Sequence, residues 1–241
     1  MQPVLRISID EISMRKGHQD FKTVVSDIDR GKLLEVIDGH TIESVTKALR
    51  QLDSTWREQI QEVSVDMWGG FPKVVEIVFP NAQIVYDRFH VMKKVNQELN
   101  KLRIRLGIKS RKSKYLLLKN ADDLKPEQQA ELEIVLTSSP CLRIAYEMKE
   151  EFRLIYENTK TFKIAKIQLE KWLGTAQVFY QDATQTIRNH MEGICNYFIS
   201  RTTSGVMEGI NNKIKLIKRQ GYGFTNFENF RSRLLAAFED K

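Results

Sequence analysis

The hydrophobic pattern of this chain changes near residue 90, and this change constrains the fold more than any other feature. Before it, short segments with alternating apolar and polar residues are interspersed with segments of helical period. From about His90 to Cys195, almost only helical periodicity remains. The sequence therefore predicts an α/β part followed by a long all-helical part.

The α/β part begins with three predicted strands, over residues 5–10, 21–28 and 33–37. The last two flank Asp29-Arg30-Gly31, a favourable hairpin turn. The pattern then predicts, in order, a helix over 41–61, a strand over 62–67, a helix over 72–79 and a strand over 83–87. A hairpin followed by helical crossovers predicts a mixed sheet with helices packed on it.

The second part reads as helices over residues 91–106, 126–136, 141–156, 162–177 and 184–198. No repeat or low-complexity linker separates it, so we interpret it as an insertion rather than a tethered domain. Two more helices, 205–219 and 224–238, follow; Thr203 or Ser204 is predicted to cap the first and Gly221 to end it. We therefore predict a core at 1–90, an insertion at 91–198 and the C-terminal core helices at 199–241.

Charge points weakly to a polyanionic partner, because the formal net charge is +7. One stretch without any acid holds Lys101, Arg103, Arg105, Lys109, Arg111, Lys112, Lys114 and Lys119. Such a block can follow a phosphate backbone, and we expect Arg111 and Lys112 to contact DNA. The alternative is a solvated helical face.

Several protein classes are unsupported by the sequence. It has no apolar run of roughly 20 residues that would span a membrane, and its N-terminus does not resemble a secretory signal. Cys141 and Cys195 form no CxxC pair, which argues against a zinc ribbon or disulfide framework. A cytoplasmic protein is expected.

Two predicted strands end alike, in Ser8-Ile9-Asp10 and Ser64-Val65-Asp66. If these strands are parallel neighbours, both carboxylates lie at their carboxyl ends, where open α/β sheets bind ligands. Carboxylates so close repel each other unless a cation lies between them, and oxygen ligands favour Mg²⁺ or Mn²⁺. The alternative is that each aspartate merely ends its strand and caps the segment after it.

Glu208 is a third candidate acid, near the start of the predicted helix 205–219. The apolar residues of that helix cluster on one face, and Glu208 lies opposite them. The residues that share its polar face are Asn211, Asn212, Lys215 and Arg219. By itself the signal is weak, since an acid near a helix N-terminus also matches the helix dipole.

Four strings together resemble the DDE domain of the ISL3 family of bacterial insertion-sequence transposases. They are Ile9-Asp10-Glu11, Val65-Asp66-Met67-Trp68, Tyr86-Asp87-Arg88-Phe89-His90-Val91 and Glu208-Gly209-Ile210-Asn211-Asn212-Lys213-Ile214-Lys215. The resemblance covers nearly the whole chain. It implies an α/β fold with an RNase H-like mixed sheet and helices, interrupted by a large all-helical insertion between the second aspartate and the glutamate.

The resemblance also implies a chemistry. Asp10, Asp66 and Glu208 would hold two Mg²⁺ or Mn²⁺ ions that cut DNA and join its strands by in-line displacement at phosphorus. Asp87 and His90 match a DxxH signature and would support the site, although an ordinary structural role for His90 is equally open. Phosphate contacts are expected from Asn211, Asn212, Lys215, Lys218 and Arg219.

The implied partners are transposon ends and target DNA, bound by a homodimer on paired ends at the nucleoid, with no small-molecule cofactor and no membrane. The family normally begins with a zinc-binding segment and helix-turn-helix elements, which are missing before Asp10, so we expect end recognition to be lacking. Two tryptophans are open to interpretation. Trp172 could stack on a flipped base or be a core residue, and Trp68 is expected to pack beneath the active site.

Two rival interpretations are an RNase H-like host nuclease, which would cut without joining, and a decayed or domesticated DNA-binding protein without catalysis.

Overall fold

A computed structural model describes residues 3–15, 19–67, 69–202, 205–221, 224 and 226–239. The expected roles of Trp68, Thr203 and Ser204 lie outside this part of the chain. The chain divides into two compact units, which we call the sheet unit (Met1–Asp87 and Thr202–Lys241) and the helical unit (Arg88–Arg201). Among the described residues, no helix is long and apolar enough to cross a membrane.

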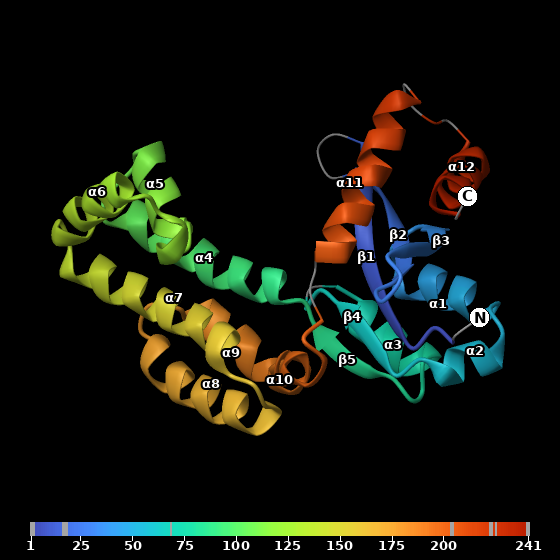
Figure 1. Ribbon diagram of the computed structural model, residues 1–241, viewed down its shortest axis with the longest axis horizontal. Coiled ribbons are helices and arrows are strands. Elements are labelled where there is room, and N and C mark those ends of the chain that lie inside the picture. The colour runs from blue at the N-terminus through green and yellow to red at the C-terminus, as the bar shows by residue number, and fades with distance from the viewer. Residues whose placement is uncertain are drawn as a thin grey trace. The chain divides into compact units, whose positions relative to one another are not determined.

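The sheet unit is built on a five-stranded sheet in the order β3-β2-β1-β4-β5 (Figure 1). The strands are β1 (Arg6–Arg15), β2 (Gln19–Asp27), β3 (Lys32–Asp38), β4 (Glu62–Val65) and β5 (Gln83–Tyr86). β1, β2 and β3 pair antiparallel, whereas β4 pairs parallel to both β1 and β5. This confirms the predicted mixed sheet.

Helices complete the unit: α1 (Ile42–Arg50), α2 (Ser54–Gln59), α3 (Phe71–Val78), α11 (Gly205–Gln220) and α12 (Phe227–Phe238). Side chains alternate along β1, so Ile7 and Ile9 are buried on one face of the sheet and Ile12 on the other. Ile12 joins a core cluster with Ile210 and Ile214 of α11. The apolar stripe predicted for α11 therefore packs on the sheet.

One predicted helix is two. Residues 41–61 were expected to form a continuous helix, but α1 ends at Arg50 and α2 starts at Ser54. The Asp53 side chain accepts a hydrogen bond from the backbone N–H of Trp56, and an N-cap of this kind starts a new helix. The prediction missed the break because the apolar spacing continues across it.

The helical unit contains α4 (Arg88–Arg105), α5 (Arg111–Leu118), the 3₁₀ turn η1 (Ala121–Asp123), α6 (Pro126–Thr137), α7 (Pro140–Asn158), α8 (Phe162–Ala176), α9 (Gln181–Asn189) and α10 (Met191–Ser200). Helix α5 was not predicted, because its basic residues obscure a short apolar side that buries Leu116 and Leu117. The helix predicted over 184–198 is wrong as one element, since α9 and α10 meet at His190.

Aromatic residues form the core of the helical unit. Trp172 is only 1% exposed, and its ring centroid lies 4.5 Å from that of Phe152 and 5.7 Å from that of Tyr180. Its indole N–H donates to the carbonyl of Met148 at 2.8 Å. The base-stacking interpretation of Trp172 is therefore wrong, and the alternative of a core tryptophan is confirmed.

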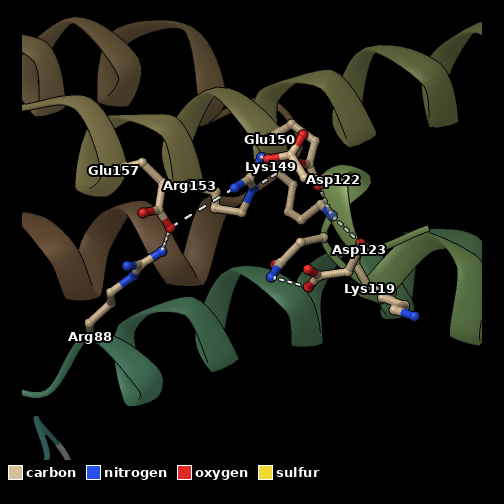
Figure 2. Close-up of polar contacts among 9 residues, drawn as sticks. Arg88, Lys119, Asp122, Asp123, Lys149, Glu150, Arg153 and Glu157 are labelled. Atoms are coloured by element: carbon tan, nitrogen blue, oxygen red, sulfur yellow. Dashed lines mark hydrogen bonds and ion pairs between the residues drawn. The ribbon is translucent and has the colours of Figure 1, made fainter. Parts of the chain in front are cut away.

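A network of charged residues joins α7 to the chain around it (Figure 2). Lys149, 1% exposed, forms an ion pair with Glu150 and donates to the carbonyl of Lys119 at 3.1 Å. The Arg153 guanidinium contacts Glu150 at 2.8 Å and Asp122 at 2.7 Å. Burial lowers the pKa of Lys149, although its partner Glu150 counteracts that shift.

Candidate active site

Asp10 and Asp66 follow the same register in two neighbouring strands. The parallel pairing of β1 with β4 runs from Arg6 opposite Glu62 to Ser8 opposite Ser64, and each aspartate comes two residues later. The expected parallel neighbourhood of the two strands is confirmed. Both residues are partly buried, at the carboxyl edge of the parallel part of the sheet.

The next strand continues this register. Val65 of β4 lies opposite Tyr86 of β5, and the backbone N–H of Asp87 donates to the carbonyl of Val65 at 3.2 Å. Asp66 and Asp87 are thus the next residues in adjacent strands. Three acids, Asp10, Asp66 and Asp87, occupy equivalent positions across β1, β4 and β5, and partners in register share a face of the sheet.

This alignment has a sequence signal that could have been used for Asp87. Val65-Asp66 and Tyr86-Asp87 both place an aspartate directly after a buried strand residue. The sequence indicated Asp87 only through the DxxH signature that it forms with His90. His90, from the same motif, belongs to the helical unit and lies in the first turn of α4.

The Asp10 carboxylate is held by two hydrogen bonds. Its Oδ1 accepts from the backbone N–H of Glu11 at 2.8 Å, and its Oδ2 accepts from the side-chain amide of Asn211 at 2.7 Å. Among the described residues Asp10 forms no ion pair. A partly buried carboxylate is therefore oriented by neutral donors, with its negative charge uncompensated.

Helix α11 lies along β1 (Figure 1), and its apolar residues share a core cluster with Ile12 of β1 and Val24 of β2. Met207 contacts Ser26, which pairs with Ser8, while the Lys218 ammonium donates to the carbonyl of Ser13 at 3.0 Å. The helix and β1 therefore run in the same direction. Glu208 is exposed, one turn before Asn211, and residues so spaced lie on the same side of a helix.

The acids do not converge fully. Within the described ranges, no three or more His, Cys, Asp or Glu side chains are grouped closely enough to hold a metal ion. The backbone brings Asp10, Asp66 and Asp87 to one edge, and α11 places Glu208 one turn from the residue that contacts Asp10.

The polar face of α11 is only partly free for a ligand. Asn212, Lys215 and Arg219 are exposed, whereas Asn211 and Lys218 are partly buried against the sheet. Burial lowers the pKa of Lys218. Its ammonium also donates to the carbonyl of Ser13, so it is less available to a ligand than the exposed cations of α11.

The basic block of the helical unit is also divided. Arg111 is exposed, and Lys112 forms an ion pair with Glu131 at 2.6 Å across an exposed surface. Arg103 is buried, and its guanidinium donates to Asn100 and to backbone carbonyls of the segment before α5. Arg103 therefore holds the connection between α4 and α5, and within the basic block it is not available to a phosphate backbone.

Comparison with known proteins identifies the family. Residues 7–234 match the family model of ISL3-type DDE proteins, described as transposase. The chain belongs to the ISL3 family of transposases. The resemblance of the four strings is thereby confirmed over almost the whole sequence.

Similar proteins carry the same name. A transposase for insertion sequence element IS1001 from Bordetella parapertussis is 29% identical over 96% of this chain and 60% of its own length. A transposase for element IS1557 from Mycobacterium tuberculosis is 28% identical over 91% of the chain and 56% of its own length. This ISL3-family chain thus spans less than two thirds of the length of these relatives.

A shorter match bears another name. A Lactococcus lactis protein called ATP-dependent protease is 27% identical over 42% of this chain and 32% of its own length. The ISL3-family sequence has no GxxxxGK[ST] phosphate-binding loop.

Proposed function

We propose that this chain is the catalytic part of a DDE transposase, which cuts DNA and joins the cut strand to a target with two divalent metal ions. The observation that supports this most is the common register of Asp10 and Asp66 at the carboxyl edge of β1 and β4. Docking of α11 on Asp10 then supplies Glu208 from a distant part of the chain.

The sheet supports an RNase H-like core. Three antiparallel strands, β1 to β3, are extended by the parallel strands β4 and β5 on the β1 side, and α11 packs on the face that Asp10 occupies. The helical unit begins directly after Asp87 and ends directly before Thr202. We interpret it as an insertion between the second aspartate and the glutamate.

The residues of the site fit divalent metal ions. Asp10 is partly buried without a cationic partner in the described chain, and the neighbouring Asn211 Oδ1 is buried and accepts no hydrogen bond there. Every donor atom of the set is a carboxylate or amide oxygen, which suits Mg²⁺ or Mn²⁺. Asp10, Asp66 and Glu208 would hold two such ions, with Asp87 as a supporting carboxylate at the same edge.

When bound, the ions would supply an activated water or DNA 3′-hydroxyl and stabilise the leaving oxygen. The protein's part is to fix the acids. β1 holds Asp10 within a continuous strand, Asp66 follows the last residue of β4, and the buried face of α11 holds the helix that bears Glu208. Rigid elements of this kind keep ligands in a productive geometry.

The DNA is positioned, in this proposal, by exposed side chains around the site. Asn212, Lys215 and Arg219 of α11 would contact phosphates near the acids, and Arg111 and Lys112 of α5 would contact the duplex elsewhere. His90 and Lys218 would support the surrounding structure. Transposon ends and target DNA are the substrates, bound by a homodimer at the nucleoid in the cytoplasm.

A strand-transfer assay tests the proposal. Pre-cleaved end DNA of the element is incubated with a supercoiled plasmid, Mn²⁺ and either the wild-type chain, Asp66→Asn or the control Glu58→Gln, which changes an exposed acid of α2. We expect joined products from the wild type and the control and none from Asp66→Asn.

Three results would contradict the proposal. Nicking without joining would point to a nuclease. DNA binding without products in any variant would point to a non-catalytic protein. Joining that survives Asp66→Asn would exclude this site as the catalytic centre.

A further inference from the structure

Asn211 is the side chain that connects the first acid to the helix bearing the third. We infer that Asn211 is a positioning residue of the metal site: its amide N–H₂ sets the orientation of the Asp10 carboxylate, and its carbonyl oxygen faces the ligand shell of the cation. This inference rests on the proposed function. It gives Asn211 a role other than the phosphate contact expected from the sequence.

Two hydrogen bonds, one to each oxygen, orient the Asp10 carboxylate. Asn211 Nδ2 donates to Asp10 Oδ2 at 2.7 Å, while the Glu11 backbone N–H donates to Oδ1 at 2.8 Å. One donor per oxygen fixes the rotation of the carboxylate. Because each carboxylate oxygen has two acceptor positions, each retains one that can meet a cation.

The oxygen of the Asn211 side-chain amide lies at the other end of the group that contacts Asp10. Asn211 Oδ1 is buried and has no hydrogen-bond partner among the described residues. Reversing the amide would not relieve this, since it would point the carbonyl oxygen at the carboxylate of Asp10. Buried polar atoms are normally paired, so an unpaired oxygen beside an uncompensated carboxylate marks a place for a ligand.

The helix makes the contact rigid. Met207, Ile210 and Ile214 are buried on the neighbouring side of α11 and hold that turn on the sheet. Asparagine has a low helix propensity, so the Asn211-Asn212 pair costs helix stability. Asn212, one residue away, is exposed and provides a control of the same residue type in the same helical turn.

The contact also sets the relative position of two acids. Glu208 lies one turn before Asn211 on the same side of α11. If Asn211 is docked on Asp10, the distance from Glu208 to β1 is set by the helix itself. Loss of the amide is therefore expected to loosen both Asp10 and the approach of Glu208.

Mn²⁺ affinity tests the inference without requiring DNA or activity. Free Mn²⁺ is measured by electron paramagnetic resonance as it is titrated into the wild-type chain, Asn211→Ala, Asn212→Ala and Asp10→Asn. Loss of a residue that orients a metal ligand costs about 10- to 100-fold in affinity. We expect Asn211→Ala to weaken Mn²⁺ binding by this factor, Asn212→Ala to leave the Kd unchanged and Asp10→Asn to abolish the site.

Asn211→Asp separates the donor from the acceptor. This variant keeps an oxygen at the Oδ1 position but places a second carboxylate against that of Asp10. Because a cation relieves the repulsion between the two carboxylates, Mn²⁺ should raise the Tm of this variant more than it raises the Tm of the wild type. A purely structural role predicts a lower metal-free Tm for Asn211→Ala with an unchanged Mn²⁺ Kd, and this result would overturn the inference. Wild-type affinity in Asp10→Asn would instead overturn the proposed function, so the two failures are distinguishable.

Discussion

The two units of this ISL3-family chain each contain a buried or partly buried group of charged residues, and the two groups are built differently. In the helical unit, Lys149 and Arg153 meet Glu150, so opposite charges lie in contact (Figure 2). In the sheet unit, Asp10, Asp66 and Asp87 share one register, and Asp10 has no cationic partner among the described residues. The first group pairs its charges within the protein, whereas we propose that divalent cations pair the charges of the second.

This difference predicts opposite responses to the same substitution. Removing one partner of a buried ion pair leaves the other charge uncompensated and destabilises the fold. Replacing Asp10, a carboxylate without a cationic partner among the described residues, leaves no opposite charge uncompensated and spares the fold. An acid-to-amide substitution should therefore cost stability in the helical unit and activity in the sheet unit.

The largest expected effect is on activity, from Asp10→Asn. Metal ions contribute several kcal/mol of charge stabilisation in the transition state, and each 1.36 kcal/mol is a factor of ten in rate, so strand transfer should fall by about a thousandfold or more. The free energy of unfolding in metal-free buffer should change by only about 1 kcal/mol, because one of the two hydrogen bonds to Asp10 is lost while an unpaired charge is removed. Gel analysis of joined products measures the activity, and urea denaturation measures the free energy of unfolding. A strong loss of stability in Asp10→Asn would contradict the proposed difference between the two units.

Glu150→Gln is the matching change in the helical unit. It leaves the buried Lys149 ammonium without its anion, and breaking such a pair costs about 3–5 kcal/mol. Urea denaturation measures this loss, with Glu151→Gln as the control because Glu151 is exposed on the same helix. If both variants lose the same free energy of unfolding, the buried ion pair between Lys149 and Glu150 contributes no more than an exposed acid, and the comparison between the two units fails.

The pH dependence of stability sharpens the same point. Burial lowers the pKa of Lys149 in the folded chain below its ordinary value of 10.5. Between the folded and the ordinary pKa the unfolded chain binds more protons, so this group makes the free energy of unfolding rise with pH across that window. Compared with Lys149→Met, the wild type should gain stability as the pH rises toward 10.5, as followed by urea midpoints. A difference that is flat or falls with pH would exclude a depressed pKa.

The smallest effects are expected at the DNA-facing residues. Lys215→Ala and Arg219→Ala remove exposed charges from α11, and each should weaken DNA binding about equally for all sequences and reduce the salt slope by about one. Fluorescence anisotropy at several salt concentrations measures this slope. Ion-paired Lys112 provides the contrast, since Lys112→Ala should reduce the slope less than Arg111→Ala.

The sequence predicted those parts of the site that depend on local pattern. The helical crossover between Ser8-Ile9-Asp10 and Ser64-Val65-Asp66 implied the parallel pairing that the sheet has. The predicted end of the first strand at Asp10 is wrong, because β1 continues to Arg15 in its antiparallel pairing with β2. The apolar stripe of α11 likewise predicted which side of the helix packs on the sheet.

Contacts between distant residues were beyond local pattern. The hydrogen bond from Asn211 to Asp10 joins residues 201 positions apart, so no spacing indicated that this asparagine turns toward the sheet. Trp172 shows the same limit, because a helical tryptophan in a basic chain can face solvent or core, and only the packing of α7 against α8 decides. The early end of α1 depended on a single cap at Asp53.

Anomalous diffraction from crystals soaked with Mn²⁺ tests the central claim most directly, because it locates the ions without any assumption about activity. The proposal predicts peaks in contact with the carboxylates of Asp10 and Asp66, with Glu208 turned toward them and Asn211 still hydrogen-bonded to Asp10. Peaks confined to other acids, with Asp10 and Asp66 apart and free of metal, would contradict it.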